Sequence, residues 1–376
     1  MPHISCAFDG GNIECLNAEN PADIQLTIRK DNKSDFYQWF HFRLTGAQGQ
    51  HVRMRILNAG GASYAKGFAD YSMAASYDRE VWFRIPTQFD GKELNVEISP
   101  ELDSMYFAYF APYSMERHAD LIAWACDSPL VNYERLGATL DGQDMDLLKI
   151  GDQDPKKKNY WVIARQHPGE TMAEWWMEGF LERLTDDHDP VAKALLAAAN
   201  FYVVPNMNPD GSRRGHLRTN AAGANLNREW QSPSLETSPE VFHVLNKMRQ
   251  IGVDFSLDVH GDEALPYNFI AGPEGVPSWS DFRQSQLDGY KDALARISPD
   301  FQTKVGYPAT APGKANLTIC TNFIAETFGC LSMTLEMPFK DTKDTPDELY
   351  GWSPQRCQRL GAANLDALLG HLHFSA

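Results

Sequence analysis

Residues Trp161–Met172 read WVIARQHPGETM, an apolar run typical of a strand that is followed by a short polar turn. His167 and Glu170 stand three residues apart at the end of this run, so an imidazole nitrogen and a carboxylate oxygen can reach one metal ion. The stretch FSLDVHGDE offers a third ligand, His260, at the end of a second apolar run. Two histidines and one glutamate suit a catalytic zinc ion whose fourth position is open for water.

The same three residues also allow an interpretation without a metal. His167 would cap a strand end, His260 would satisfy a buried carbonyl group, and Glu170 would start a helix at its positive end. The local spacing does not separate these interpretations, so the remainder of the chain has to decide between them.

The chain outside this stretch changes character once. Six runs between Asp23 and about Pro112 alternate apolar and polar residues: IQLTI, YQWFHFRL, HVRMRIL, VWFRI, LNVEI and MYFAYF. This period of two predicts antiparallel strands, and hence an all-β sandwich domain over residues 1–115. From residue 116 to 376 apolar strands such as FYVVP and LSMTL alternate with helical segments such as Thr171–Leu184. We expect an α/β domain there, with a mixed central sheet and helices on both faces.

A hydrolytic site also needs a general base, and the segment LSMTLEM supplies Glu336. Alternation along a strand places Ser332, Thr334 and Glu336 on one face and the apolar side chains on the other. A buried carboxylate needs a partner or a function, because burying it unpaired is costly. The alternative is a glutamate on an edge strand that faces water.

Cationic and amide side chains gather between these segments: Arg213, Arg214, His216, Arg218, Asn227 and Arg228. A guanidinium fork with an amide is suited to a free carboxylate, and a guanidinium also stabilises an oxyanion. Such groups are what an enzyme acting at a peptide C-terminus requires.

The motifs HPGE, VVPNMNPDGSRRGHLRTNAAGANLNREW and LSMTLEMPF, in this order, resemble the zinc metallocarboxypeptidases of the carboxypeptidase A clan. The likeness is closer to the cytosolic carboxypeptidase branch, because FYQWFHFRLTG and MYFAYFAPYS resemble the β-sandwich domain that precedes the catalytic domain there. The resemblance implies one Zn²⁺ per chain on His167, Glu170 and His260. It also implies hydrolysis of the C-terminal peptide bond of peptides or protein tails.

The resemblance assigns further roles to individual residues. It makes Glu336 the catalytic glutamate, places Asn227 and Arg228 on the terminal carboxylate, and places Arg218 on the scissile carbonyl. Arg213 and Arg214 are expected on a solvated loop face. Tyr307 is a candidate, by position alone, for the mobile tyrosine of classical members.

The preferred C-terminal residue stays open, because ICTNFIAE carries no basic side chain where a glutamate-removing member is expected to have one. Two other functions also remain. A zinc-dependent deacylase of the desuccinylase and aspartoacylase group shares His-x-x-Glu and a distant histidine. A non-catalytic protein that binds peptide tails would use the same fold. The sandwich domain favours the carboxypeptidase over the deacylase, and a residue for every catalytic role speaks against an inactive protein.

The composition limits the partners and the cellular location that are expected for the protein. The 376 residues are 43% hydrophobic and 22% charged, with a net charge of -16 that disfavours nucleic acid and anionic membrane surfaces as partners. The N-terminus resembles no signal peptide, and the six scattered cysteines form no Cys-x-x-Cys pair. We therefore expect reduced thiols and a cytoplasmic location. The C-terminal HLHFSA is expected to be a frayed tail, and the oligomeric state is left open.

Overall fold

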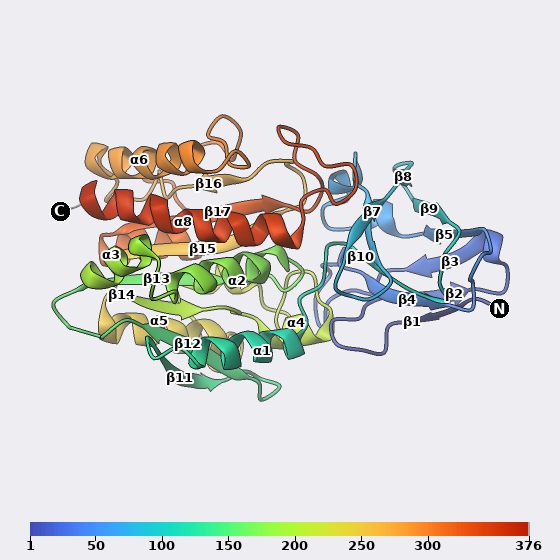
Figure 1. Cartoon of the computed structure of the whole chain (residues 1–376), viewed down its shortest axis with the longest axis horizontal. Coiled ribbons are helices and arrows are strands. Elements are labelled where there is room, and N and C mark those ends of the chain that lie inside the picture. Colours follow the sequence, from blue (N-terminus) through green and yellow to red (C-terminus); the bar gives the residue numbers. More distant parts are fainter. Residues whose placement is uncertain (375–376) are drawn as a thin grey trace.

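The structure, a computed structural model, describes residues 1–374 in two parts that lie end to end (Figure 1). The N-terminal part contains two five-stranded sheets. The first has the order β1 (His3–Ser5), β4 (His41–Thr45), β10 (Ser104–Ala108), β6 (Met73–Ser76) and β7 (Phe83–Ile85). The second has the order β2 (Glu14–Asn17), β3 (Ile24–Thr27), β5 (Val52–Ile56), β9 (Leu94–Ile98) and β8 (Thr87–Phe89).

These strands follow from the alternation in the sequence. In β5, Val52, Met54 and Ile56 are buried, while Arg53 between them is exposed. Each of the six predicted runs contains a strand, and a β-rich N-terminal domain is thereby confirmed. The expectation of purely antiparallel pairing was wrong, because β3 and β5 pair in parallel. The chain crosses to the other sheet as β4 between them and so returns in the same direction.

The C-terminal part is built on one seven-stranded mixed sheet. Its order is β11 (Val131–Ala138), β12 (Asp144–Ile150), β14 (Ala199–Val204), β13 (Lys158–Ala164), β15 (Phe255–Asp262), β17 (Leu331–Pro338) and β16 (Phe269–Ala271). The four predicted strands form its parallel centre, from β14 to β17. Antiparallel strands complete both edges, and these were not predicted. The α/β class is confirmed.

Helices cover both faces of this sheet. One layer contains α1 (Met115–Cys126), α2 (Met172–Leu184), α3 (Pro190–Ala198), α6 (Asp281–Ile297) and α8 (Pro354–Phe374), seen in front of the sheet in Figure 1. The other contains α5 (Pro239–Ile251) and α7 (Cys320–Phe328). Side chains of β13 alternate between the two layers, with Val162 in the first and Trp161 and Ile163 in the second. Because both faces are covered, β15 and β17 are buried along their whole lengths.

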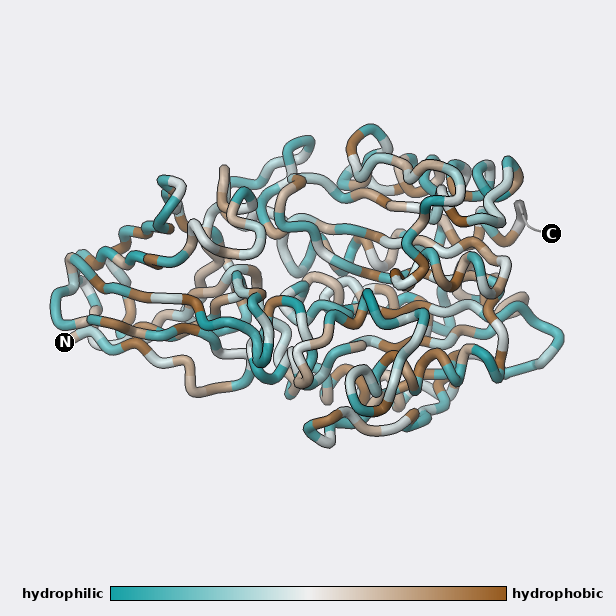
Figure 2. Tube along the Cα trace, turned by 180° about the vertical axis from the view of Figure 1, so that it is seen from behind, coloured by the Kyte–Doolittle hydropathy of each residue, from teal (hydrophilic) through white to brown (hydrophobic). Residues whose placement is uncertain are grey.

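This architecture excludes one alternative and contradicts one expectation. Strand β17 lies between β15 and β16, so Glu336 is not a water-facing residue of an edge strand. Helix α8 continues to Phe374 and His371 is buried, so the expected frayed tail is wrong there; the last two residues lie outside the described part. Within residues 1–374 no helix is long and apolar enough to cross a bilayer. Figure 2 accordingly shows short hydrophobic stretches interrupted by hydrophilic ones.

Helices α2 and α8 pack closely because each has a glycine at the contact. A Cβ atom on Gly179 would lie 2.0 Å from the carbonyl oxygen of Gln358, and one on Gly361 would lie 2.1 Å from that of Trp176. Neither position has room for a side chain, because the obstructing atoms belong to the backbone of the facing helix.

We expect Gly179→Ala to lower the free energy of unfolding by about 1–3 kcal/mol, because the methyl group forces the two helices apart. Gly289→Ala is the matched control, since Gly289 is also helical but has no atom within 4 Å of an added Cβ. Helix propensity predicts that this control is stabilised by up to about 1 kcal/mol. Urea denaturation measures both variants, and an undiminished stability of Gly179→Ala would contradict the packing argument.

Candidate active site

The carboxyl ends of three parallel strands bring the predicted site together. His167 and Glu170 lie in the turn between β13 and α2, His260 lies near the end of β15, and Glu336 lies near the end of β17. The parallel pairing places His260 directly beside Glu336 on the neighbouring strand. All four side chains are buried, and Glu336 is the most exposed at 7%.

Three of these residues converge on one point. Nδ1 of His167 is 2.8 Å from Oε1 of Glu170, Nδ1 of His260 is 2.7 Å from Oε2, and the two Nδ1 atoms are 3.2 Å apart. Nε2 of His167 lies 3.0 Å from Oδ1 of Asn225, and Nε2 of His260 lies 2.9 Å from Oδ2 of Asp258.

The outer partners define the tautomer of each ring. Amide and carboxylate oxygens accept hydrogen bonds, so in the neutral imidazoles Nε2 carries the proton and Nδ1 presents its lone pair toward Glu170. A carboxylate and two nitrogen lone pairs that point at one place suit a divalent cation such as zinc. The donor set therefore fits the metal that the sequence predicts. The metal-free interpretation, in which the three residues only cap local structure, does not require three donor atoms to meet at one point.

The sequence analysis missed both outer partners. Asp258 precedes His260 by two residues and shares its face of β15, so the period of two carried a signal for it. No local pattern links Asn225 to His167, because the two meet only through the fold.

Glu336 faces a cleft of about 540 Å³ that the metal-binding candidates also line. Burial raises the pKa of Glu336 well above its usual range; His260 opposes this, and the nearby carboxylates of Glu170 and Asp262 add to it. The hydroxyl group of Tyr307 is 2.6 Å from Oδ2 of Asp262 and 3.4 Å from Oε1 of Glu336. Tyr307, a candidate by position, thus lies within reach of the predicted base.

Arg218, Asn227 and Arg228 line the same cleft. Nε of Arg218 is buried and has no hydrogen-bond partner among the described residues. Arg228 is exposed and donates from Nη1 to the carbonyl oxygen of Asn227 at 2.7 Å. Oδ1 of Asn227 accepts from the backbone N–H of Cys320, which leaves the amide NH₂ group available.

Other residues of the cationic cluster lie elsewhere. Arg213 and Arg214 are exposed away from the cleft, as expected, but they lie in the last turn of a helix and not in a loop. Arg214 binds Asp141. His216 is a structural residue, because both its ring nitrogens are bound to backbone groups. The segment ICTNFIAE lines the cleft with Ile319, Thr321 and Asn322, which are uncharged. Four ionisable residues that the sequence analysis missed also line it: Asp262, Glu263, Glu274 and Lys291.

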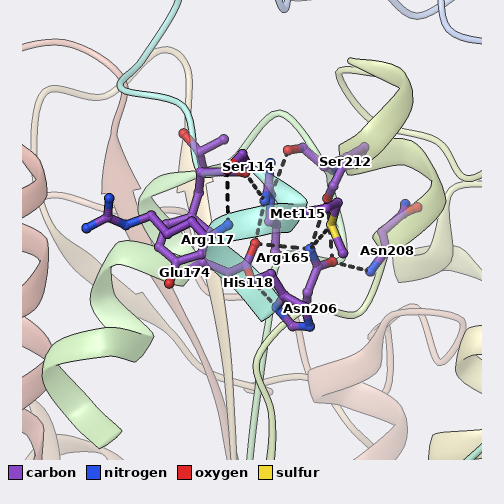
Figure 3. A network of polar contacts seen from close by, with 12 residues as sticks. Ser114, Met115, Arg117, His118, Arg165, Glu174, Asn206, Asn208 and Ser212 are labelled. Atoms are coloured by element: carbon purple, nitrogen blue, oxygen red, sulfur yellow. Dashed lines mark hydrogen bonds and ion pairs between the residues drawn. The ribbon is translucent and has the colours of Figure 1, made fainter. Parts of the chain in front are cut away.

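A network of polar contacts fixes the turn that contains His167 and Glu170, the ligand turn (Figure 3). Arg165 has a left-handed backbone, with φ of 58°, at the point where the chain leaves β13. Its guanidinium donates to the carbonyl oxygens of Pro168 and Tyr113, each at 2.9 Å, and binds the carboxylate of Glu174. Asn208 donates to the carbonyl oxygen of Gln166 at 2.9 Å. The carbonyl groups on both sides of His167 are therefore fixed.

Glu174 is the centre of this network and is fully buried. Its carboxylate lies 2.7 Å from Nδ1 of His118 and accepts from Nδ2 of Asn206 at 3.0 Å. His118 on α1 continues the network to Asp146 on β12, 2.9 Å from its Nε2. Burial opposes the charged form of His118, but Glu174 and Asp146 outweigh it and raise its pKa to about 9.

The mixed sheet covered by helices and preceded by a β-rich domain is a carboxypeptidase-like fold. Residues 119–358 match the family described as zinc carboxypeptidase. Residues 4–110 match the cytosolic carboxypeptidase N-terminal domain. The protein belongs to the zinc carboxypeptidase family, and the resemblance seen in its motifs is confirmed.

Its relatives include proteins of similar length and much longer ones. An uncharacterized protein of Zymomonas mobilis is 52% identical over 95% of this chain and 93% of its own length. Human cytosolic carboxypeptidase 1 is 27% identical over 70% of this chain, which spans 26% of that protein. The crystal structure of a metallo-carboxypeptidase from Burkholderia cenocepacia is 47% identical with a TM-score of 0.97, covering 99% of this chain and 100% of its own.

We expect Asp258→Asn to weaken zinc binding about 10- to 100-fold, because Asp258 orients His260 and increases the basicity of its Nδ1. Competition with a chromogenic chelator measures the dissociation constant without any substrate. Asp254→Asn, a change at a partly exposed carboxylate near the other end of β15, is the control and leaves the affinity unchanged. Equal affinities of both variants would contradict the orienting role.

The raised pKa of His118 predicts a pH-dependent stability. A histidine whose pKa is about 9 when folded and about 6.5 when unfolded stabilises the protein fully below pH 6.5, and this stability is lost as the pH rises toward 9. We expect His118→Gln to lower the free energy of unfolding by about 3 kcal/mol more at pH 6 than at pH 9.5. Urea denaturation at both pH values measures this difference. His188→Gln, at a histidine whose side chain is 91% exposed, shows no such difference.

Proposed function

We propose that His167, Glu170 and His260 bind one zinc ion per chain, and that the protein hydrolyses the C-terminal peptide bond of peptides or protein tails. The observation that carries this proposal is the convergence of these three side chains beside Glu336, in one cleft with Arg218, Asn227 and Arg228. When bound, the zinc ion supplies the positive charge that acidifies water and polarises a carbonyl group.

Glu336 acts as the general base in this proposal. It takes a proton from the attacking water and returns it to the amine that leaves. Its buried position raises the proton affinity of the carboxylate, which suits a group that must hold a proton between two steps. The hydroxyl group of Tyr307 lies near enough to Glu336 to hold this carboxylate in the cleft.

The side chains of Arg218, Asn227 and Arg228 recognise the substrate. The guanidinium of Arg228 and the free NH₂ group of Asn227 bind the terminal carboxylate, which restricts the enzyme to the last residue of a chain. Arg218 donates to the oxygen of the scissile carbonyl as negative charge develops on it.

Similar proteins support the binding of a carboxylate in the cleft and the cellular location. A metallo-carboxypeptidase from Pseudomonas aeruginosa, 45% identical with a TM-score of 0.95, has been crystallised with (2-guanidinoethylmercapto)succinic acid, a ligand that carries two carboxylic acid groups. A carboxylate clamp in this cleft agrees with such a ligand. The cytosolic carboxypeptidases among the relatives favour a cytoplasmic location for this protein as well.

A peptide library that varies only in its last residue tests the proposal. We expect the zinc-loaded protein to release single C-terminal residues, detected by mass spectrometry, and a chelator to stop the release. Glu336→Gln, which keeps the shape of the side chain, binds zinc but turns over at least about 100-fold more slowly. Hydrolysis of N-acyl amino acids without peptide cleavage would instead support a deacylase. A Glu336→Gln variant of undiminished activity would show that another group is the base.

A further inference from the structure

The N-terminal domain holds the chain segment that carries Arg218. This segment, residues 213–221, begins in the last turn of α4 (Pro209–Arg214) and lies against two loops of the N-terminal domain. Gly10 donates its N–H to the carbonyl oxygen of Arg213 at 3.0 Å, and Asn12 donates from Nδ2 to that of Gly215 at 2.8 Å. Asn32 binds the carbonyl oxygen of Ala221 at 2.7 Å. The segment is therefore fixed along its length by the other domain.

Asp31 makes the densest of these contacts. Its carboxylate, on a side chain only 3% exposed, accepts hydrogen bonds from three successive backbone N–H groups. These belong to Leu217 at 2.7 Å, Arg218 at 2.8 Å and Thr219 at 2.9 Å. The hydroxyl group of Thr219 adds a fourth bond at 3.1 Å. Hydrogen bonds to an ionised acceptor are stronger than those between neutral groups, so this part of the backbone has little freedom.

The side chain of Arg218 is also held by the N-terminal domain. Its guanidinium carbon lies 5.4 Å from the ring centre of Phe36 and 5.4 Å from that of Tyr64. Both distances are within the range of cation–π attraction. Tyr64 itself lines the cleft together with the metal-binding candidates. Two aromatic rings of one domain thus confine a cation of the other.

The same segment reaches the ligand turn. The carbonyl oxygen of Leu217 accepts from the N–H of Gly169 at 2.9 Å, between His167 and Glu170. A Cβ atom at Gly169 would lie 2.9 Å from that oxygen, so the approach requires glycine. Leu217 is bound by Asp31 on one side and by the ligand turn on the other.

We propose that the N-terminal domain is part of the active site, with Asp31 as a positioning residue for Arg218 and with Phe36 and Tyr64 as the groups that orient its guanidinium. A donor that is oriented before the reaction needs no rearrangement when charge develops on the substrate oxygen. The inference rests on the proposed function, which assigns that oxygen to Arg218. In this inference the N-terminal domain contributes to catalysis as well as to the stability of the fold.

A double-mutant cycle on the full-length, zinc-loaded protein tests the inference. Arg218→Ala is expected to lower kcat by about 100- to 1,000-fold, and Asp31→Asn by up to about 100-fold, with KM changed little in the second case. In the Arg218→Ala background, Asp31→Asn changes kcat by no more than about twofold, because its effect passes through the missing arginine. Losses that multiply in the double variant would overturn the inference.

Two further variants keep the test decisive. Phe36→Leu is a milder change at a half-buried residue and lowers kcat by about 3- to 10-fold, so the cycle can be repeated if Asp31→Asn does not fold. Asp189→Asn is the control, because Asp189 also accepts hydrogen bonds from two backbone N–H groups but lies at the start of α3. We expect this variant to be less stable and to keep the wild-type kcat. If Arg218→Ala retains full activity, the proposed role of Arg218 fails and the inference fails with it.

Discussion

The geometry of the candidate active site depends on the register in which β15 pairs with β17. This register places His260 beside Glu336, and a slip of one residue would turn Glu336 away from the cleft and an apolar neighbour into it. Met333, Leu335 and Met337 are buried in the main core, on the other face of β17. Their burial fixes the register, so hydrophobic packing, and not a polar contact, determines where the predicted base stands relative to the predicted metal ligands.

The ligand turn is held by a different kind of interaction. His167 and Glu170 follow the end of a strand, where no ladder of sheet hydrogen bonds continues, and the turn is instead fastened by side chains to its carbonyl groups. Arg165 and His118 share the buried carboxylate of Glu174, so opposite charges compensate each other out of contact with water. A buried charge that lost its partner would be strongly destabilising. The packed strands and this polar network therefore position different parts of the same site.

The sequence predicted what local patterns encode. A period of two revealed the strands that became β5 and β17, and the ordered motifs led to His167, Glu170, His260 and Glu336. It did not reveal β11, β12 or β16. Strand β11 has no fully buried residue and therefore no apolar face to recognise, and β16 has only three residues. It also missed Asn225 and Asp31, whose partners lie 58 and 187 residues away in the sequence. Contacts of this range are created by the fold and leave no mark in either local segment.

The carboxylate of Asp31 also has a consequence for how such a protein can change during evolution. It joins a loop of the first domain to backbone groups of the second, so the border between the domains does not coincide with the border of the cleft. A substitution in either segment therefore changes the hydrogen bonds that the other segment makes. A domain that replaced the first one would therefore need an acceptor at the position of Asp31 to keep these three hydrogen bonds.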